Sequence, residues 1–154
     1  MRHAVTCLPL AAALCAAAQA QPSPPHAWLF GAWTGGLYPV TAAVAGQACL
    51  GQPTVIFTRD VVLRAQLTTP TYVQRLIVTA RAAGGQTELQ FTPSVDAEAT
   101  LDKGLVGLDP PEAAPGFGCE NADVLHVRRL SDTEIAFPGC KEFPEKLVRC
   151  PGSR

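Results

Sequence analysis

The side chains best suited to acid–base chemistry are two close pairs of carboxylates, Asp96 with Glu98 and Asp109 with Glu112. A carboxylate within reach of a substrate can take up or release a proton during a reaction. Both pairs lie within residues 93–118, a long, acidic and proline-rich stretch without periodicity, which we interpret as a large loop. We therefore expect these carboxylates to be solvated rather than catalytic.

The sequence carries no further signature of an enzyme. No serine lies in a G-x-S-x-G motif, and Ser131 is explained as a turn residue. His126 is expected on the outer face of a strand, and nearby Glu120 and Asp123 lack the spacing of metal ligands. We therefore predict that the protein is not an enzyme and uses no metal or cofactor.

Four cysteines remain once residues 1–20 are set aside: Cys49, Cys119, Cys140 and Cys150. An even number suggests two disulfides, which four cysteines can form in three ways. We favour Cys140 with Cys150, because the intervening segment contains a proline turn that can bring its ends together, and Cys49 with Cys119 then follows. No C-x-x-C motif points to redox or zinc chemistry, and paired cysteines leave no thiolate nucleophile.

Residues 1–20 have the pattern of a signal peptide. Arg2 and His3 precede an apolar run over residues 7–18, which ends at an A-x-A cleavage site at residues 18–20. This run is too short to cross a bilayer, and no later segment is long enough. The mature chain is thus expected in a periplasm or outside the cell, without a transmembrane segment. The excess of arginine over lysine and the abundant alanine favour a GC-rich bacterium as the source.

The mature chain is nearly neutral. Without Arg2, 11 basic side chains stand against 13 acidic ones, a balance that argues against nucleic-acid binding. Residues 21–27 contain three prolines and are expected to form an extended, poorly ordered leader. Residues 28–154 are then expected to form one domain.

The pattern after the leader predicts an all-β fold. Hairpin turns are expected at Gly84-Gly85 and Ser131-Asp132, and apolar residues alternate with polar ones on either side of them. Residues 41–49 could form one or two turns of helix, but the segment is too short to predict a helix. Strand-like segments lie at residues 28–34, 54–58, 61–66, 72–82, 87–92, 124–130, 133–138 and 145–149. We predict a small antiparallel barrel or sandwich of about 7–8 strands with two disulfides.

The Gly31-Ala32-Trp33 motif at the start of the first expected strand resembles that of lipocalin-like (calycin-type) secreted barrels. It is similar, more loosely, to the periplasmic barrels that inhibit metalloproteases. The resemblance implies that Trp33 closes one end of the barrel and stacks with an arginine from a late strand, Arg149 or Arg128. We expect Trp28 in the core as well, with a surface anchor as the alternative.

The expected function is binding. The resemblance implies a carrier of a small apolar ligand, in a cavity bounded by Trp33, Phe57, Tyr72 and Phe91, or an inhibitor whose leader enters a protease cleft. The alternative is a cell-envelope structural or interaction protein with a filled core and a surface patch for a secreted or periplasmic partner.

The arginines on the expected strands suggest where such a patch would lie. We place Arg75 and Arg81 on one face, opposite Tyr72, Leu76 and Val78. An outer face shared with Arg64 and Arg128 would bind an anion or a protein partner. We favour ordinary cross-strand pairing with Glu88, Glu134 and Asp60.

Overall fold

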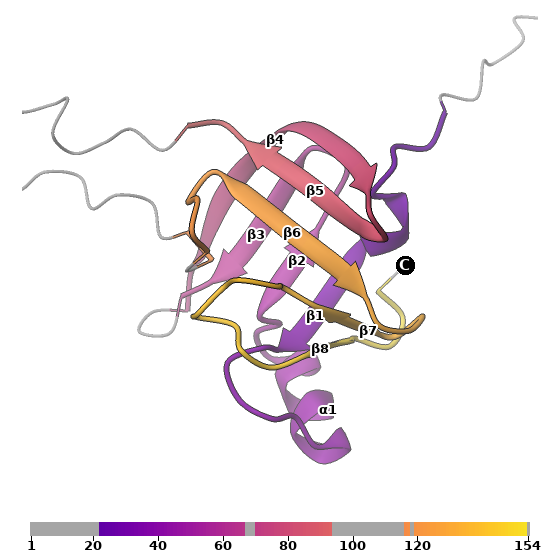
Figure 1. Cartoon of the computed structure of the whole chain (residues 1–154). Coiled ribbons are helices and arrows are strands. Elements are labelled where there is room, and N and C mark those ends of the chain that lie inside the picture. Colours follow the sequence, from indigo (N-terminus) through magenta and orange to yellow (C-terminus); the bar gives the residue numbers. More distant parts are fainter. Residues whose placement is uncertain (1–21, 67–69, 94–115, 118, 154) are drawn as a thin grey trace, which may run out of the picture.

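The structure is a computed structural model that describes residues 22–66, 70–93, 116–117 and 119–153. The expected signal peptide and most of the expected loop at residues 93–118, including both carboxylate pairs, lie outside the described residues. Within them, eight antiparallel strands follow one another around a closed barrel (Figure 1). The prediction of a small antiparallel β fold is therefore confirmed, and of its two forms the barrel is the one observed.

All eight expected strands form, with ends that differ by a few residues. The first begins later than expected because Ala27–Leu29 forms a short 3-10 helix, η1. The strands are β1 (Gly31–Gly35), β2 (Val55–Phe57), β3 (Val61–Ala65), β4 (Tyr72–Ala83), β5 (Gln86–Phe91), β6 (Val124–Arg129), β7 (Glu134–Ala136) and β8 (Leu147–Arg149).

Strand β1 closes the barrel because it pairs on both of its sides. Its central residue, Trp33, lies opposite Val55 of β2 and opposite Arg149 of β8. Each of the eight described strands therefore has a neighbouring strand on both sides, which limits the unpaired edge on which a second chain could add. It also places the last strand beside the first, so residues far apart in sequence meet at one end of the barrel.

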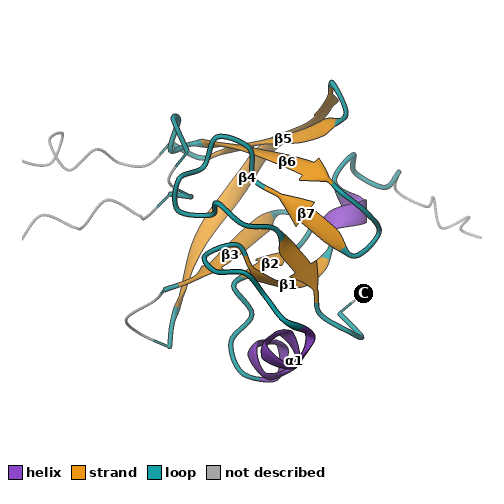
Figure 2. Ribbon diagram, turned by 60° about the horizontal axis from the view of Figure 1, so that its bottom comes forward, coloured by secondary structure: helices purple, strands orange, loops and turns teal. Residues whose placement is uncertain are grey.

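The segment that looked too short for a helix forms α1 (Ala42–Leu50), which lies outside the barrel beside β1 (Figure 2). The Thr41 hydroxyl accepts a hydrogen bond from the Val44 N–H, and the Gly51 N–H donates to the Gln47 carbonyl at 3.0 Å. A helix of this length is marginal alone. The disulfide from Cys49 to Cys150 ties it to the end of β8.

The core lies inside the barrel and is built by alternation along the strands. On β5 and β6 the inward residues Leu89, Phe91, Leu125 and Val127 are buried, whereas His126 between them is exposed. This is the period-2 pattern expected from the sequence. Phe117, from outside the strands, is buried in the same core.

The alternation shifts within β4 and corrects the expected placement of the arginines. The pairing of β4 with β5 shifts register between Ile77 and Thr79, and a bulge of this kind reverses which residues face inward. Arg75, before the bulge, is buried inside the barrel, and the apolar Leu76 and Val78 face outward. Arg81, after the bulge, is exposed. The two arginines do not share a face.

The expected disulfide pairing is wrong, although all four cysteines are paired. The observed disulfides are Cys49–Cys150 and Cys119–Cys140. Strand β8 lies between Cys140 and Cys150, and its extended backbone carries them apart. Cys150 instead lies beside β1, where its N–H donates to the Ala32 carbonyl at 2.9 Å.

Candidate binding surface at the closed end of the barrel

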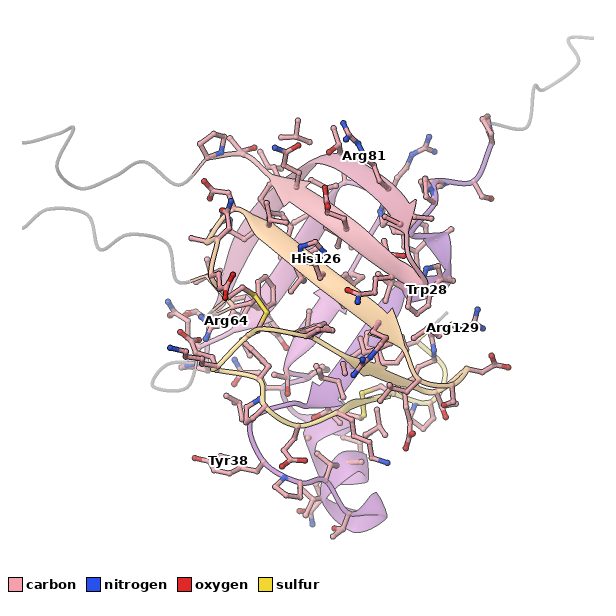
Figure 3. All side chains as sticks on the ribbon, in the orientation of Figure 1. Trp28, Tyr38, Arg64, Arg81, His126 and Arg129 are labelled. Atoms are coloured by element: carbon pink, nitrogen blue, oxygen red, sulfur yellow. A yellow bond between two sulfur atoms is a disulfide. The ribbon has the colours of Figure 1, made fainter. Side chains whose placement is uncertain are left out.

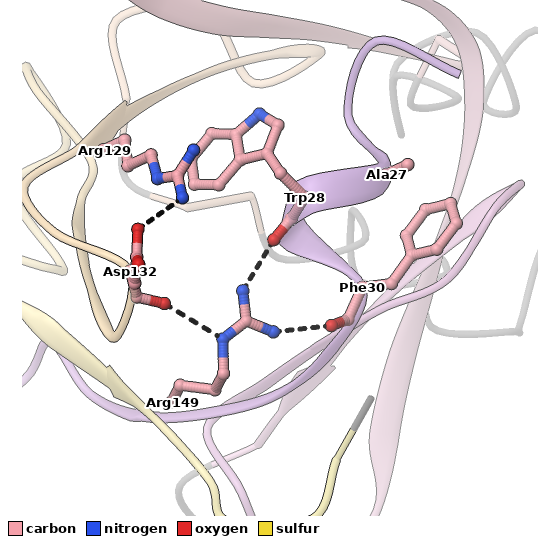
Figure 4. A pocket seen from close by; sticks show the side chains of 6 residues that line it. All are labelled: Ala27, Trp28, Phe30, Arg129, Asp132 and Arg149. Atoms are coloured by element: carbon pink, nitrogen blue, oxygen red, sulfur yellow. Dashed lines mark hydrogen bonds and ion pairs between the residues drawn. The ribbon is translucent and has the colours of Figure 1, made fainter. Parts of the chain in front are cut away.

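Arg149 links the first strand, the last strand and η1 at one end of the barrel. Its guanidinium stacks on the Trp33 ring, 4.1 Å from the ring centre. It also donates hydrogen bonds to the backbone carbonyls of Trp28 at 2.6 Å and Phe30 at 2.7 Å (Figure 4). Of the two arginines that the resemblance allowed, Arg149 is the partner of Trp33, whereas Arg128 is exposed on β6.

Trp28 lies at the rim of this closed end. Its indole N–H donates to the Thr87 hydroxyl at 3.1 Å, and Thr87 is itself buried. The guanidinium of Arg129 lies over the Trp28 ring at 5.3 Å, and Arg129 forms an ion pair of 2.5 Å with Asp132. Trp28 packs against the core yet is only partly buried. It therefore contributes to the core, and part of its ring stays accessible at the surface.

Two hollows flank the stacked pair of Trp28 and Arg129. One, of about 420 Å³, is lined by Ala27, Trp28, Phe30, Arg129, Asp132 and Arg149 (Figure 4). The other, of about 330 Å³, lies toward the turn between β4 and β5 and is lined by Trp28, Ala82, Ala83, Gly84, Gly85, Gln86, Thr87 and Arg129. Trp28, Arg129, Asp132 and these two hollows are called the Trp28–Arg129 surface below.

The end of the leader is folded onto the barrel, contrary to the expectation for residues 21–27. His26 is 2% exposed, its Nε2 lies 2.9 Å from the Arg59 carbonyl, and its ring meets Phe30 edge-on at 5.2 Å. The Ala27 N–H donates to the Pro24 carbonyl at 2.9 Å. These contacts fix the point at which the chain leaves the barrel next to Trp28, while Pro22 and Ser23 stay exposed.

The residues expected around an apolar cavity are not all brought together. Trp33, Phe57 and Phe91 are buried in one core cluster with Phe117, Phe137 and Phe143. Tyr72 is only partly buried and donates a hydrogen bond to the Pro53 carbonyl at 2.9 Å. Burial raises the pKa of the Tyr72 phenol above its ordinary value of 10.0.

At the other end of the barrel, Arg64 and Arg75 point inward from β3 and β4 rather than onto an outer face. Arg64 forms an ion pair with Glu142, and Arg75 one of 2.5 Å with Asp123. Burial lowers the pKa of the Arg64 guanidinium, an effect that the negative charge of Glu142 partly opposes. The sequence alone offered no reason to place these two arginines inside, because charged side chains are usually exposed.

The remaining candidates for chemistry stay apart. His126 is exposed, as expected, beside a surface hollow of about 290 Å³ that Glu120 also lines. Among the described residues, no three His, Cys, Asp or Glu side chains gather as a metal site would require. No helix in the described part of the chain has the length and apolar character needed to cross a membrane.

Comparisons of the chain with models of protein families, with curated proteins and with solved structures gave no match. The structure itself defines a class: a small, closed, eight-stranded antiparallel barrel with two disulfides. One end is closed by a tryptophan–arginine stack, and the Trp28–Arg129 surface lies beside it.

Proposed function

We propose that the protein is an exported, non-catalytic binding module that recognises a secreted or periplasmic protein through its Trp28–Arg129 surface. The observation that carries this proposal is the stacked pair of Trp28 and Arg129 between two hollows of about 420 and 330 Å³. Tryptophan and arginine are the residue types enriched among the side chains that dominate protein interfaces. Hollows on either side can receive side chains of the partner.

The packed interior favours a protein partner over a small apolar ligand. Neighbouring phenylalanine rings of the core lie 5.5 to 6.3 Å apart, from Phe57 through Phe137 to Phe117 and Phe91. A purely apolar ligand would replace one of these buried rings by another apolar group, with little net gain. The disulfides support export, because such bonds persist in oxidising compartments.

Two forms of this function are distinguishable. As an inhibitor of a secreted protease, the protein would insert the residues that precede His26 into the cleft of the enzyme. The contacts of His26 hold the base of that segment in one place, which reduces the entropy lost on binding. As an envelope interaction protein, it would use the Trp28–Arg129 surface without the leader.

Site-specific photo-cross-linking in the producing bacterium tests the proposal. A photoreactive amino acid at position 83, an exposed alanine that lines the second hollow, should capture one defined exported protein and leaves Trp28 and Arg129 in place. The same probe at position 78, exposed on the outer face of β4, is the control and should not capture it. Equal capture at positions 83 and 78, or none at position 83, would overturn the proposal.

The captured partner then permits a quantitative test. Arg129→Ala should weaken binding by about tenfold or more, as expected for a central interface residue. The matched control is Arg128→Ala, the adjacent exposed arginine outside the surface, which should bind within twofold of wild type. Removal of residues 22–25 separates the two forms, since it should abolish protease inhibition but leave an interaction through the surface alone unchanged.

A further inference from the structure

The end of the barrel opposite Trp28 contains two arginines that are deeply buried. Arg64 is 8% exposed and Arg75 is 4% exposed. Arg64 lies opposite Val73, and Arg75 lies opposite Val62, so the two are diagonal neighbours on the inner face of β3 and β4. Side chains in this relationship start about 7–8 Å apart. Figure 3 shows Arg64 at the end of the barrel away from Trp28 and Arg129.

Each of these guanidiniums has a buried N–H that is not used. Arg64 Nε and Arg75 Nη1 have no hydrogen-bond partner among the described residues. Buried donors without an acceptor are rare and unfavourable, because they have lost their water without replacing it. Beyond the carboxylates that pair with them, the described residues at this end therefore offer no acceptor for one further N–H group of each arginine.

The arginines lie over a series of stacked aromatic rings. Arg64 lies 5.3 Å from the centre of the Phe143 ring, and Arg75 lies 5.1 Å from that of Phe91. Phe117 packs between these two rings, at 5.6 Å from Phe143 and 6.0 Å from Phe91. Phe117 belongs to no strand, so its ring is inserted into the barrel rather than built into the wall.

The carboxylates that pair with the arginines mark the rim of this end. Glu142 is 45% exposed and Asp123 is 29% exposed at their side chains, in contrast to the buried guanidiniums that they contact. Solvent therefore reaches the ion pairs from outside.

We propose that this end of the barrel binds a small molecule that carries an aromatic ring and a carboxylate, and that Phe117 occupies its ring position in the structure. Replacing the Phe117 ring by the ring of the ligand exchanges one buried phenyl group for another, so the hydrophobic contributions nearly cancel. The carboxylate oxygens accept hydrogen bonds from Arg64 Nε and Arg75 Nη1. These charge-assisted bonds supply the net affinity and the selectivity for an anion.

Phenylacetate and phenylacetamide are suitable probes, because they have the same shape and differ in charge. In the full chain, Phe117→Ala removes the competing ring and should bind phenylacetate at least tenfold more tightly than wild type does, measured by calorimetry. The same variant should prefer phenylacetate over phenylacetamide by at least tenfold. Adding Arg75→Met should remove that preference while retaining binding of the amide.

The control is Ile135→Ala, which opens a space in the core on β7 opposite Arg129, toward the other end of the barrel. It should show no preference for the acid. Equal binding of both probes to Phe117→Ala, or binding of neither, would overturn the proposal. Trp28→Ala should leave phenylacetate binding unchanged, so this test is independent of the function proposed for the closed end.

The wild-type chain provides a readout that does not depend on the folding of a variant. Saturating phenylacetate should shift the Nε–H proton resonances of Arg64 and Arg75 in an NMR spectrum, whereas phenylacetamide should not. Absence of a shift at both arginines at saturating probe would also overturn the proposal.

Discussion

The guanidinium of Arg149 lies 4.1 Å from the centre of the Trp33 ring, although the two residues are far apart in sequence. They face each other across the pairing of β1 with β8, the contact that closes the barrel. Because Arg149 also holds the carbonyls of Trp28 and Phe30, one side chain orients η1, which carries Trp28 to the candidate surface.

Substitution of Arg149 should therefore cost more stability than substitution of an ordinary surface arginine. Arg149→Met removes the stack on Trp33 and the hydrogen bonds to the carbonyls of Trp28, Phe30 and Asp132, for an expected loss of about 2–3 kcal/mol. The exposed Arg128→Met should change stability by less than about 0.5 kcal/mol. Urea unfolding of both variants measures the difference, and equal midpoints would contradict the structural role of Arg149.

The disulfide pairing can be read directly from the protein. Proteolysis without reduction, followed by mass spectrometry, should yield peptides that link Cys49 with Cys150 and Cys119 with Cys140. A peptide that links Cys140 with Cys150 would contradict the structure. On the chain-entropy model, removing the first disulfide should cost about 4–5 kcal/mol and the second about 3 kcal/mol, because the first closes the longer loop.

Two leucines provide a matched test of the barrel core. Leu147 on β8 is fully buried, whereas Leu50 at the end of α1 is 92% exposed. Leu147→Ala should lower the free energy of unfolding by about 2–5 kcal/mol, since it leaves a cavity among close-packed side chains. Leu50→Ala should stay within about 0.5 kcal/mol of wild type. Denaturant unfolding measures both changes. A larger loss of stability for Leu50→Ala than for Leu147→Ala would contradict the described core.

The hydrogen-bonded phenol of Tyr72 should make stability depend on pH in the alkaline range. Burial raises the pKa of Tyr72 in the folded protein above 10.0, so the unfolded chain releases this proton first as the pH rises. The stabilisation is complete below pH 10 and is lost as the pH passes the folded pKa.

The Tyr38→Phe variant isolates this effect, because the chain has two tyrosines. Its tyrosinate absorbance should titrate with a midpoint above 10 when folded and near 10 in guanidinium chloride. Identical midpoints in the two conditions would show that Tyr72 is not buried as described. Adding Tyr72→Phe should remove this contribution to the alkaline loss of stability.

Strand positions were predictable because each strand carries its own signal. On β5 and β6, alternation of apolar and polar residues places Leu89, Phe91 and Leu125 inside without knowledge of any partner strand. The identity of the arginine on Trp33 was narrowed to Arg149 or Arg128 by the resemblance, and only the pairing of β1 with β8 selects Arg149. The helix α1 was not predicted, because the disulfide that links it to the residue after β8 joins residues far apart in sequence.

Most of the candidate surface was not predictable. Trp28 was considered as an anchor, but nothing in the sequence joins it to Arg129 or to the turn between β4 and β5. His26 was assigned to a flexible leader because of the prolines around it, whereas its burial depends on the Arg59 carbonyl from the turn after β2. Such contacts arise when distant turns meet at one end of a closed barrel.

The sequence by itself determined the period-2 strands, the number of cysteines available for disulfides and the all-β class, since these follow from local spacing and composition. Tertiary structure decided which cysteines pair, which arginines lie inside and which residues form the candidate surface. Disulfide pairing depends on which chain segments the paired strands bring together. The bulge in β4 decides that Arg81 does not share the inner face of Arg75. The Cys49–Cys150 pairing is a consequence of closing the sheet between β1 and β8, which brings residues together irrespective of their separation along the chain.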